Sequence, residues 1–310
     1  MPLYLTERDV EALLTPEDAV EAVEACFRRM AAGAVQNAPR RRLALEGGRL
    51  ADMAASDLEL GYAGAKVYAG FREGAAFVVA LFDATRPQLV AVLEADQLGR
   101  LRTGAASGVA ARHLAREGAA SLGVIGCGHQ AETQVKCIRA AVPTIGRVVA
   151  YCRTESSLER FCRAVGAEAG ESHRDAAEQD VVATITTSRD PVLRGEWLRP
   201  GAVVCAAGAN VLGARELDNV VLERAAFVCC DSKEQARLES SDLVEPIERG
   251  SLDWLEVHEL QEVVAGEVHG RQATEDIVVF KSNGLAAWDV AVAARAVELA
   301  RERGIGQEVG

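Results

Sequence analysis

Apolar and polar positions follow two different patterns along the chain, and the change between them falls near residue 120. In the first part, the helix predicted at residues 15–33 begins with Thr15 as an N-cap and Pro16 in its first turn. Short apolar runs typical of strands follow at residues 62–68, 76–82 and 88–93. This part is therefore predicted to be an α+β domain rich in hairpins.

From residue 121 the pattern becomes apolar strand, glycine or polar turn, and then helix. The predicted strands lie at residues 122–125, 148–151, 181–185, 203–206 and 227–230, and helical patterns at 130–141 and 156–165 separate the first of them. This alternation is typical of a parallel sheet covered by helices. The predicted fold class is thus α/β: a Rossmann doubly wound parallel sheet plus an α+β domain. We interpret an alanine-rich helix at 284–303 as a return to the first domain.

Composition and charge narrow the classes of protein that fit this pattern. The 310 residues are enough for two domains, and 49% of them are hydrophobic and 26% charged, as in ordinary globular proteins. No apolar run approaches the roughly 20 residues of a membrane span, and the first residues lack a secretion signal, so we expect a cytoplasmic location. The net charge of −12 opposes binding to nucleic acid phosphates.

The eight cysteines and five histidines form no recognisable metal or disulfide pattern. The cysteines are scattered without a C-x-x-C pair, so we interpret them as reduced thiols that behave as small apolar residues. The histidines show no spacing with cysteines or acids that predicts a metal site.

The clearest chemical signal is a glycine-containing loop directly after the strand at 122–125. In a dinucleotide-binding loop the first glycine permits a tight turn, the second lets the backbone approach phosphate, and a small third residue lets the helix pack on the strand. The following helix adds N–H groups and positive potential for the pyrophosphate. We interpret His129 as a loop or phosphate contact rather than a catalytic group. The residues assigned to cofactor binding here are Gly126, Gly128, His129, Gln130 and Ala131.

The turn after the second strand of this region bears on the choice of nicotinamide dinucleotide. A site selective for NAD usually places an acid there, against the ribose 2′-hydroxyl. Here the turn carries Arg153 and Thr154 instead. A guanidinium can bind a 2′-phosphate through charge-assisted hydrogen bonds. We predict a preference for NADP(H), with NAD(H) as the alternative if Arg153 is only a solvated arginine after a strand.

Several segments together carry a resemblance to a known family. At residues 100–107 a basic pair runs into small residues that can start a closely packed helix, whose N-terminus can hold an anion. With the loop at 126–131 and the segment Phe280-Lys281-Ser282-Asn283-Gly284-Leu285-Ala286, it is similar to the ornithine cyclodeaminase/mu-crystallin family. The segments Pro39-Arg40, Gly64-Ala65-Lys66-Val67 and Arg215-Glu216-Leu217-Asp218 also resemble that family's motifs, in its order and approximate spacing. The resemblance covers nearly the whole chain.

The resemblance implies a particular domain organisation and class of ligand. A dinucleotide-binding Rossmann domain, here residues 117–280, would be inserted into a substrate-binding and dimerisation domain made of residues 1–116 and 281–310. The protein would be a homodimer. Its substrates would be small molecules, namely amino acids, imino acids, or keto acids with an amine, and neither a nucleic acid nor a membrane is an expected partner.

The resemblance also implies roles for individual residues. Arg40, Lys66 and Arg102 would form a cationic clamp on the substrate carboxylate, and Thr103 would help hold the cofactor phosphate. A planar guanidinium can grip a carboxylate through two hydrogen bonds, and several cations in a nearly dry pocket favour an anion. From the residues alone, Arg40 and Arg42 are interchangeable. Lys66 is equally well a strand lysine that reaches solvent, and Arg102 a member of a structural ion pair.

One position departs from the family pattern. Where ornithine-cyclising members carry an aspartate that handles protons, the matching residue is Asn210, which also fits a simple turn. An amide can orient a group by hydrogen bonding but cannot act as a carboxylate base. Lys66 and Asn210 are therefore the catalytic candidates, with Lys66 or water as proton donor.

The function predicted from these residues is NAD(P)H-dependent reduction of a 2-imino acid, or the reverse oxidation of an amino acid. Hydride would move between the nicotinamide and the substrate α-carbon while the clamp fixes that carbon. Two alternatives stay open: a lyase of the ornithine cyclodeaminase type, and a non-catalytic ligand-binding protein of the crystallin type.

Overall fold

The helices and strands of the chain belong to two units. A computed structural model describes all residues, Met1–Gly310. One unit consists of Met1–Arg102 with Leu285–Gly310, and the other of Thr103–Gly284. These bounds differ from the sequence-based ones, 1–116 with 281–310 and 117–280, because a helix near residue 100 continues across the first boundary.

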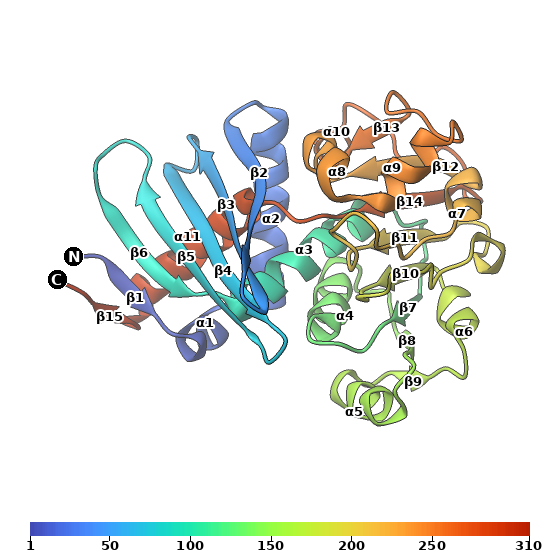
Figure 1. The fold of residues 1–310 in the computed structure, drawn as a ribbon, viewed down its shortest axis with the longest axis horizontal. Helices are drawn as coiled ribbons and strands as arrows, with labels where there is room; N and C mark the ends of the chain where they lie inside the picture. Colours follow the sequence, from blue (N-terminus) through green and yellow to red (C-terminus); the bar gives the residue numbers. More distant parts are fainter. The chain divides into compact units, whose positions relative to one another are not determined.

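The first unit is built on a seven-stranded sheet with the order β15-β1-β6-β5-β4-β3-β2. Its strands are β1 (Leu3–Leu5), β2 (Val35–Leu45), β3 (Gly48–Asp57), β4 (Tyr62–Phe71), β5 (Ala75–Asp83), β6 (Leu89–Glu94) and β15 (Gln307–Glu308). Neighbouring strands are antiparallel except β1 and β6, which are parallel. Successive hairpins from β2 to β6 form most of this sheet, as the α+β prediction expects (Figure 1).

Three helices lie wholly within the first unit: α1 (Glu7–Leu13), α2 (Pro16–Ala31) and α11 (Ala286–Arg303). Thr15 and Asp18 form a reciprocal capping box at the start of α2. Helix α11 packs on α2 and on β3, β4 and β5, and Figure 1 shows it behind the sheet. The Trp288 ring of α11 lies 5.3 Å from the Phe27 ring of α2. The C-terminal helix therefore completes the core of the first unit, as the sequence predicted.

Helix α3 (Asp96–Leu114) begins earlier than the sequence suggested. The carboxylate of Glu7 accepts hydrogen bonds from the first two helical N–H groups, at 2.6 and 2.9 Å, and so caps the helix from outside. As a result Arg102 lies in the second turn. The prediction of a helix N-terminus able to hold an anion at residues 100–107 is wrong, because that segment lies inside the helix.

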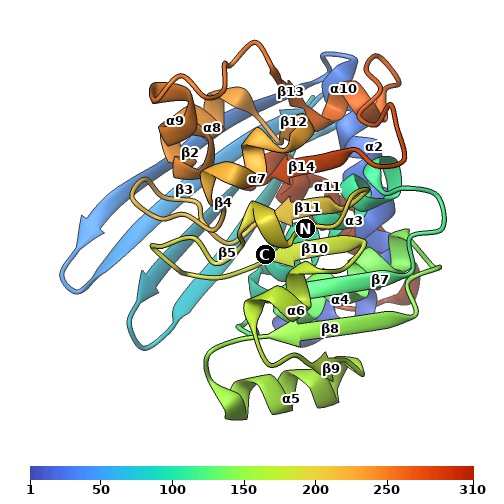
Figure 2. The same ribbon diagram turned by 90° about the vertical axis from the view of Figure 1, so that its right-hand side faces the viewer.

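The second unit contains an eight-stranded parallel sheet with the order β13-β12-β14-β11-β10-β7-β8-β9, which Figure 2 shows as a stack of neighbouring strands. Its strands are β7 (Ser121–Ile125), β8 (Arg147–Tyr151), β9 (Glu168–Ala169), β10 (Val181–Thr184), β11 (Val203–Ala206), β12 (Ala225–Cys230), β13 (Val257–Glu259) and β14 (Ile277–Lys281). Every residue of β10, β11 and β14 is buried, as expected for strands covered on both faces. The predicted Rossmann fold is confirmed.

Short helices connect the strands of the second unit. They are α4 (Ala131–Ala141), α5 (Glu155–Val165), α6 (His173–Ala177), the 3₁₀ turn η1 (Gly195–Trp197), α7 (Asn219–Glu223), α8 (Lys233–Glu239), α9 (Ser241–Glu248) and α10 (Leu260–Val264). The carboxyl ends of β7, β10, β11 and β14 share one edge of the sheet, because these neighbouring strands are parallel. In open α/β sheets this edge is where ligands bind. No helix of the protein combines the length and apolar character that crossing a membrane requires.

Candidate functional site

The loop that leaves β7 has the backbone geometry of a phosphate-binding turn. Gly126 has φ 108°, a conformation that other residues rarely adopt, and a Cβ atom there would lie 2.5 Å from the carbonyl oxygen of Ile185. Gly128 and His129 are exposed, and the position of a Cβ on Gly128 has open space around it. The first glycine is thus required by the turn, and the second leaves the backbone accessible to a ligand.

The helix that follows this loop has no side-chain cap at its N-terminus. Gln130 is the N-cap of α4, but its side chain makes no capping hydrogen bond. The N–H groups of the first helical turn therefore lack the side-chain acceptor that usually satisfies them. Ala131, fully buried, lets α4 pack closely on the sheet. An uncapped helix N-terminus beside an open glycine fits the pyrophosphate of a dinucleotide.

The turn after β8 carries positive charge. Arg153 and Thr154 are exposed, and Thr154 is the N-cap of α5 without a side-chain capping bond. The ring of His173 lies 4.6 Å from the ring of Tyr151, the last residue of β8. Partial burial lowers the pKa of His173, and the charge of Arg153 lowers it further. The guanidinium is thus close to the end of β8, where a dinucleotide-binding fold places the adenosine ribose.

In the first unit, two of the predicted clamp cations share one buried carboxylate. Lys66 of β4 donates from Nζ to Oδ1 of Asp289 at 2.9 Å, and Nε of Arg102 donates to the same oxygen at 3.1 Å. The exposed fractions are 3% for Lys66, 7% for Arg102 and 1% for Asp289. The other carboxylate oxygen, Oδ2 of Asp289, is buried without a hydrogen-bond partner. We call Lys66, Arg102 and Asp289 the clamp cluster.

The surroundings of Lys66 perturb its ammonium group. Burial lowers the pKa of Lys66 to about 8; Asp289 opposes this shift, while the charges of Arg102 and Arg40 add to it. Helix α3 makes room for the ammonium, because a Cβ atom on Gly99 would lie only 2.5 Å from Nζ. Lys66 is therefore a buried amine that can hold or release a proton near neutral pH.

The structure distinguishes the two arginines that the sequence could not. Arg40 is buried, with Nε 3.3 Å from Sδ of Met53, whereas Arg42 is half-buried. A register shift in β2 between residues 38 and 41 accounts for the break in simple alternation. Thr103 follows Arg102 directly in α3 and is also buried. Arg40, rather than Arg42, is therefore the arginine of β2 whose charge lowers the pKa of Lys66.

Asp289, which joins Lys66 to Arg102, was not among the residues predicted from the sequence. It lies in the alanine-rich helix α11, 223 positions from Lys66 along the chain. The available signal was an acid among small and apolar residues in the first turn of a helix that is buried almost all round. Such an acid needs a partner, since a buried unpaired charge is costly.

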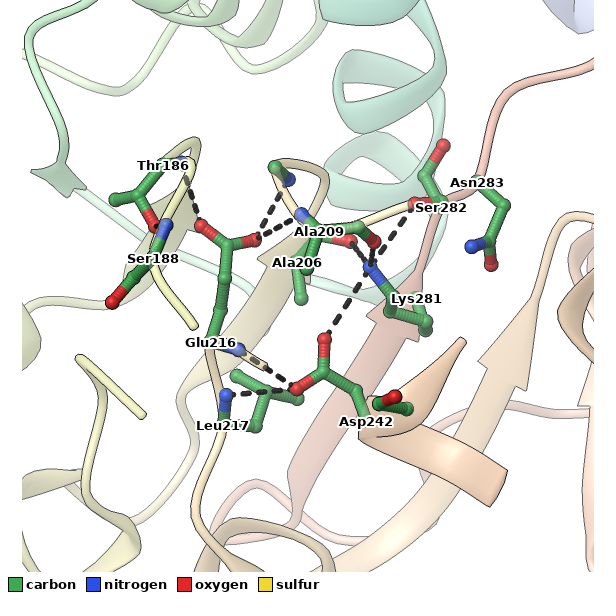
Figure 3. Close-up of polar contacts among 12 residues, drawn as sticks. Thr186, Ser188, Ala206, Ala209, Glu216, Leu217, Asp242, Lys281, Ser282 and Asn283 are labelled. Atoms are coloured by element: carbon green, nitrogen blue, oxygen red, sulfur yellow. Dashed lines mark hydrogen bonds and ion pairs between the residues drawn. The ribbon is translucent and has the colours of Figure 1, made fainter. Parts of the chain in front are cut away.

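A second polar cluster organises the sheet edge of the second unit (Figure 3). Lys281, at the end of β14, is fully buried, and its Nζ lies 3.4 Å from Oδ2 of Asp242. The same ammonium donates to the carbonyl oxygens of Ala206, Ala209 and Ser282. It therefore holds the loop after β11 against the end of β14.

Glu216 holds the same loop through its N–H groups. One carboxylate oxygen accepts from Thr186 N at 2.6 Å, and the other accepts from Gly208 N at 2.7 Å and Ala209 N at 3.2 Å. Asp242 in turn accepts from the backbone of Glu216 at 2.9 Å. Burial raises the pKa of Glu216, an effect that the nearby Lys281 opposes. We call Lys281, Asp242 and Glu216 the loop cluster.

Asn210 is the next residue in the loop that this cluster fixes. It is half-buried and follows Ala209, whose N–H and carbonyl are both held. Asp231 similarly accepts from the N–H groups of Asn283 and Gly284, at 2.7 and 2.6 Å, after β14. No group of three or more His, Cys, Asp or Glu side chains is arranged to bind a metal ion.

Comparison with known proteins agrees with this architecture. The alanine dehydrogenase of Archaeoglobus fulgidus is 37% identical, over 99% of this chain and 98% of that protein. The structure of Thermococcus litoralis Δ1-pyrroline-2-carboxylate reductase in complex with NADH and L-proline superimposes with a TM-score of 0.93 at 31% identity, covering 99% of this chain and 100% of that one. An archaeal alanine dehydrogenase dimer with bound NAD superimposes with a TM-score of 0.92 at 35% identity, covering 100% and 99%.

The family model with the description ornithine cyclodeaminase/mu-crystallin family matches residues 2–304, which include both units. The resemblance found in the motifs therefore holds along nearly the entire chain. The chain belongs to the ornithine cyclodeaminase/mu-crystallin family.

Proposed function

We propose that the protein is an NAD(P)-dependent oxidoreductase that reduces a 2-imino acid to an amino acid, or catalyses the reverse oxidation. Relatives named alanine dehydrogenase, Δ1-pyrroline-2-carboxylate reductase and iminosuccinate reductase act within this class of reaction. Their substrates share a carboxylate next to the carbon that exchanges hydride. The class of enzyme predicted from the sequence, oxidoreductases that interconvert imino acids and amino acids, is therefore also the class of these relatives.

The clamp cluster is the observation that carries this proposal. Only Nε of Arg102 is used by Asp289, so its two Nη groups remain to pair with a substrate carboxylate. Lys66 keeps two further N–H donors, and Arg40 adds positive charge beside it. Asp289 supplies one negative charge against the two positive charges of Lys66 and Arg102, and buried positive charge in excess of this costs free energy unless a second anion compensates it. A carboxylate-bearing substrate fits that requirement.

The residues of the second unit fit a nicotinamide dinucleotide. The nicotinamide supplies or accepts the hydride. The open glycine Gly128, the uncapped N-terminus of α4 and Gln130 would hold the pyrophosphate, with Thr103 as a further phosphate contact. Arg153 and Thr154 would face the ribose 2′ position and favour NADP(H) over NAD(H).

Lys66 is the proposed proton donor in the reductive direction. Reduction of an imine adds hydride to carbon and requires a proton on nitrogen. An amine with a pKa of about 8 is mostly protonated at pH 7, yet releases its proton more readily than an ordinary lysine. Asn210 would orient the substrate nitrogen by hydrogen bonding, since its amide cannot exchange the proton.

We also propose that the active form is a homodimer built through the first unit. The support is the archaeal alanine dehydrogenase dimer, which shares the fold over the whole chain. Light scattering at low micromolar concentration should give twice the 32.9 kDa mass of the chain. An active monomer would contradict the proposal.

A substrate screen tests the proposed activity. Purified protein is mixed with NADPH or NADH and a panel of 2-keto acids, with ammonia or methylamine, and absorbance of the reduced cofactor is followed. The proposal expects consumption that depends on both keto acid and amine. Conversion of ornithine to proline without net consumption of cofactor would indicate the lyase instead. Binding without turnover of any substrate would indicate the non-catalytic alternative.

A further inference from the structure

The carboxylate of Asp289 has an arrangement that the proposed carboxylate clamp does not explain by itself. A clamp for an anion gains nothing from a resident anion, which competes with the substrate for the same cations. Yet Asp289 is 1% exposed and bonds to both Lys66 and Arg102. Its presence therefore calls for a role other than binding the substrate carboxylate.

We propose that Asp289 is a positioning residue whose Oδ1 atom fixes the Lys66 ammonium beside Arg102 and keeps it charged for proton transfer. This inference rests on the proposed function, in which Lys66 gives its proton to the substrate nitrogen. It concerns the state of Lys66 itself, which can be measured without turnover.

The geometry supports this role in two ways. Both cations bond to the same oxygen, so Asp289 sets the separation of the group that binds carboxylate and the group that donates the proton. Gly99 leaves the space into which the ammonium is drawn, since any side chain there would meet Nζ. One carboxylate from α11 thereby aligns groups from β4 and α3.

The charges around Lys66 determine the sign of the effect. The charged groups that act on it are Asp289 from α11, Arg102 from α3 and Arg40 from β2. The two arginines and burial all favour the neutral amine, and Asp289 is the one charged group that favours the ammonium. The Phe77 ring, 5.4 Å from Nζ, adds a weaker cation–π attraction that the substitution of Asp289 leaves in place. Removing the charge of Asp289 must therefore lower the pKa of Lys66 further below its value of about 8.

The substitution Asp289→Asn is well suited to test this. Because Oδ1 makes both bonds and Oδ2 makes none, the amide oxygen can replace Oδ1 and the amide nitrogen can take the empty position. The variant changes charge with little change in shape. Asp289→Ser, which also removes the charge, is the second variant if the first fails to fold.

A lysine titration by NMR reads the result directly. The chain has four lysines, Lys66, Lys136, Lys233 and Lys281, so protein labelled with ¹³C at lysine Cε gives few signals, and Lys66→Arg assigns the one needed. We expect the Lys66 midpoint to fall by about one pH unit in Asp289→Asn. Asp18→Asn, which breaks the ion pair with Arg295 of the same helix α11, is the matched control and should leave the midpoint unchanged.

The pH profile of kcat/KM completes the test. Reduction needs the ammonium, so its rate declines as pH rises through the pKa of Lys66. In Asp289→Asn this decline should move to lower pH by the same amount as the NMR midpoint. An unchanged midpoint in the variant overturns the inference. A shifted midpoint with an unshifted rate profile supports the inference and instead contradicts proton donation by Lys66.

Discussion

The two buried polar clusters differ in how completely their charges are used. In the loop cluster, Lys281 faces Asp242 and three carbonyl oxygens, and Glu216 accepts three backbone N–H groups. In the clamp cluster, two cations share one carboxylate oxygen, and Nη groups of Arg102 remain without a protein partner. In the first arrangement the groups bond mainly to the backbone, and only Oδ2 of Asp242 lacks a hydrogen bond, although it faces the Lys281 ammonium at 3.4 Å. The second arrangement has donors to spare.

This difference indicates that the loop cluster supports the structure and that the clamp cluster binds a ligand. A network that bonds mainly to the backbone fixes the backbone, and here it holds the loop that carries Asn210. A network with spare donors can still bind a ligand, and we expect the substrate carboxylate to accept hydrogen bonds from these donors. Substitutions in the loop cluster should therefore change stability first, whereas substitutions in the clamp cluster should change activity first.

The largest effect is expected from Lys281→Ala. It leaves Asp242 buried without its cation, so the free energy of unfolding should fall by about 3–5 kcal/mol, as measured by urea denaturation. Lys136→Ala, which breaks only the exposed pair with Glu132, is the control and should cost less than about 1 kcal/mol. An equal decrease in the free energy of unfolding of the two variants would show that the loop cluster contributes no more to stability than an exposed ion pair.

Arg102→Ala should have the opposite outcome, a large loss of activity with a small loss of stability. Loss of the carboxylate contact should lower kcat/KM by about two orders of magnitude or more, while NADPH affinity and stability change much less. Arg41→Ala, on the exposed pair with Asp52, should leave kcat/KM near normal. Near-normal turnover by Arg102→Ala would show that the spare donors are not a substrate site.

Gly99→Ala tests the position of Lys66 without touching a charge. The added methyl must displace Nζ, 2.5 Å away at the end of a flexible side chain, so kcat/KM should fall by about tenfold. The helix itself should be no less stable, because alanine favours helix over glycine by about 1 kcal/mol. Steady-state kinetics measures the expected fall in kcat/KM, and thermal unfolding measures the stability. An unchanged rate would show that Lys66 takes no part in the reaction.

Arg153→Ala should have the most limited effect, confined to the choice of cofactor. Removing the guanidinium should weaken NADPH binding by about tenfold, the value of a charge-assisted hydrogen bond, and leave NADH binding unchanged. Paired fluorescence titrations of both cofactors measure this. A wild-type protein that binds NADH as tightly as NADPH would already contradict the role of Arg153.

The two regions were not equally predictable from sequence. The strands and helices around the phosphate loop were predicted because their signals are local: an apolar run, a glycine turn and a helix. Strand β14 was missed, although its residues are all buried between β11 and β12. A single four-residue apolar run without a following α/β repeat has little to distinguish it from other buried segments.

The first unit shows where sequence reasoning fails for physical reasons. Strand β2 carries three arginines in a row and a register shift, so its alternation is hidden. Asp289 has no local pattern at all, because its role depends on α11 returning to the sheet across the length of the chain. Contacts made by distant segments, rather than propensity, determine this part of the site.

The most direct test of the account compares two cyclic imines that differ only in the carboxylate: Δ1-pyrroline-2-carboxylate and Δ1-pyrroline. Each is mixed with the protein and NADPH, and oxidation of NADPH is followed together with formation of the amine. We predict that the carboxylate-bearing imine is reduced with one NADPH consumed per product, and that Δ1-pyrroline is reduced at a rate at least about 100-fold lower. Equal rates for the two imines would contradict the carboxylate clamp on which the account depends.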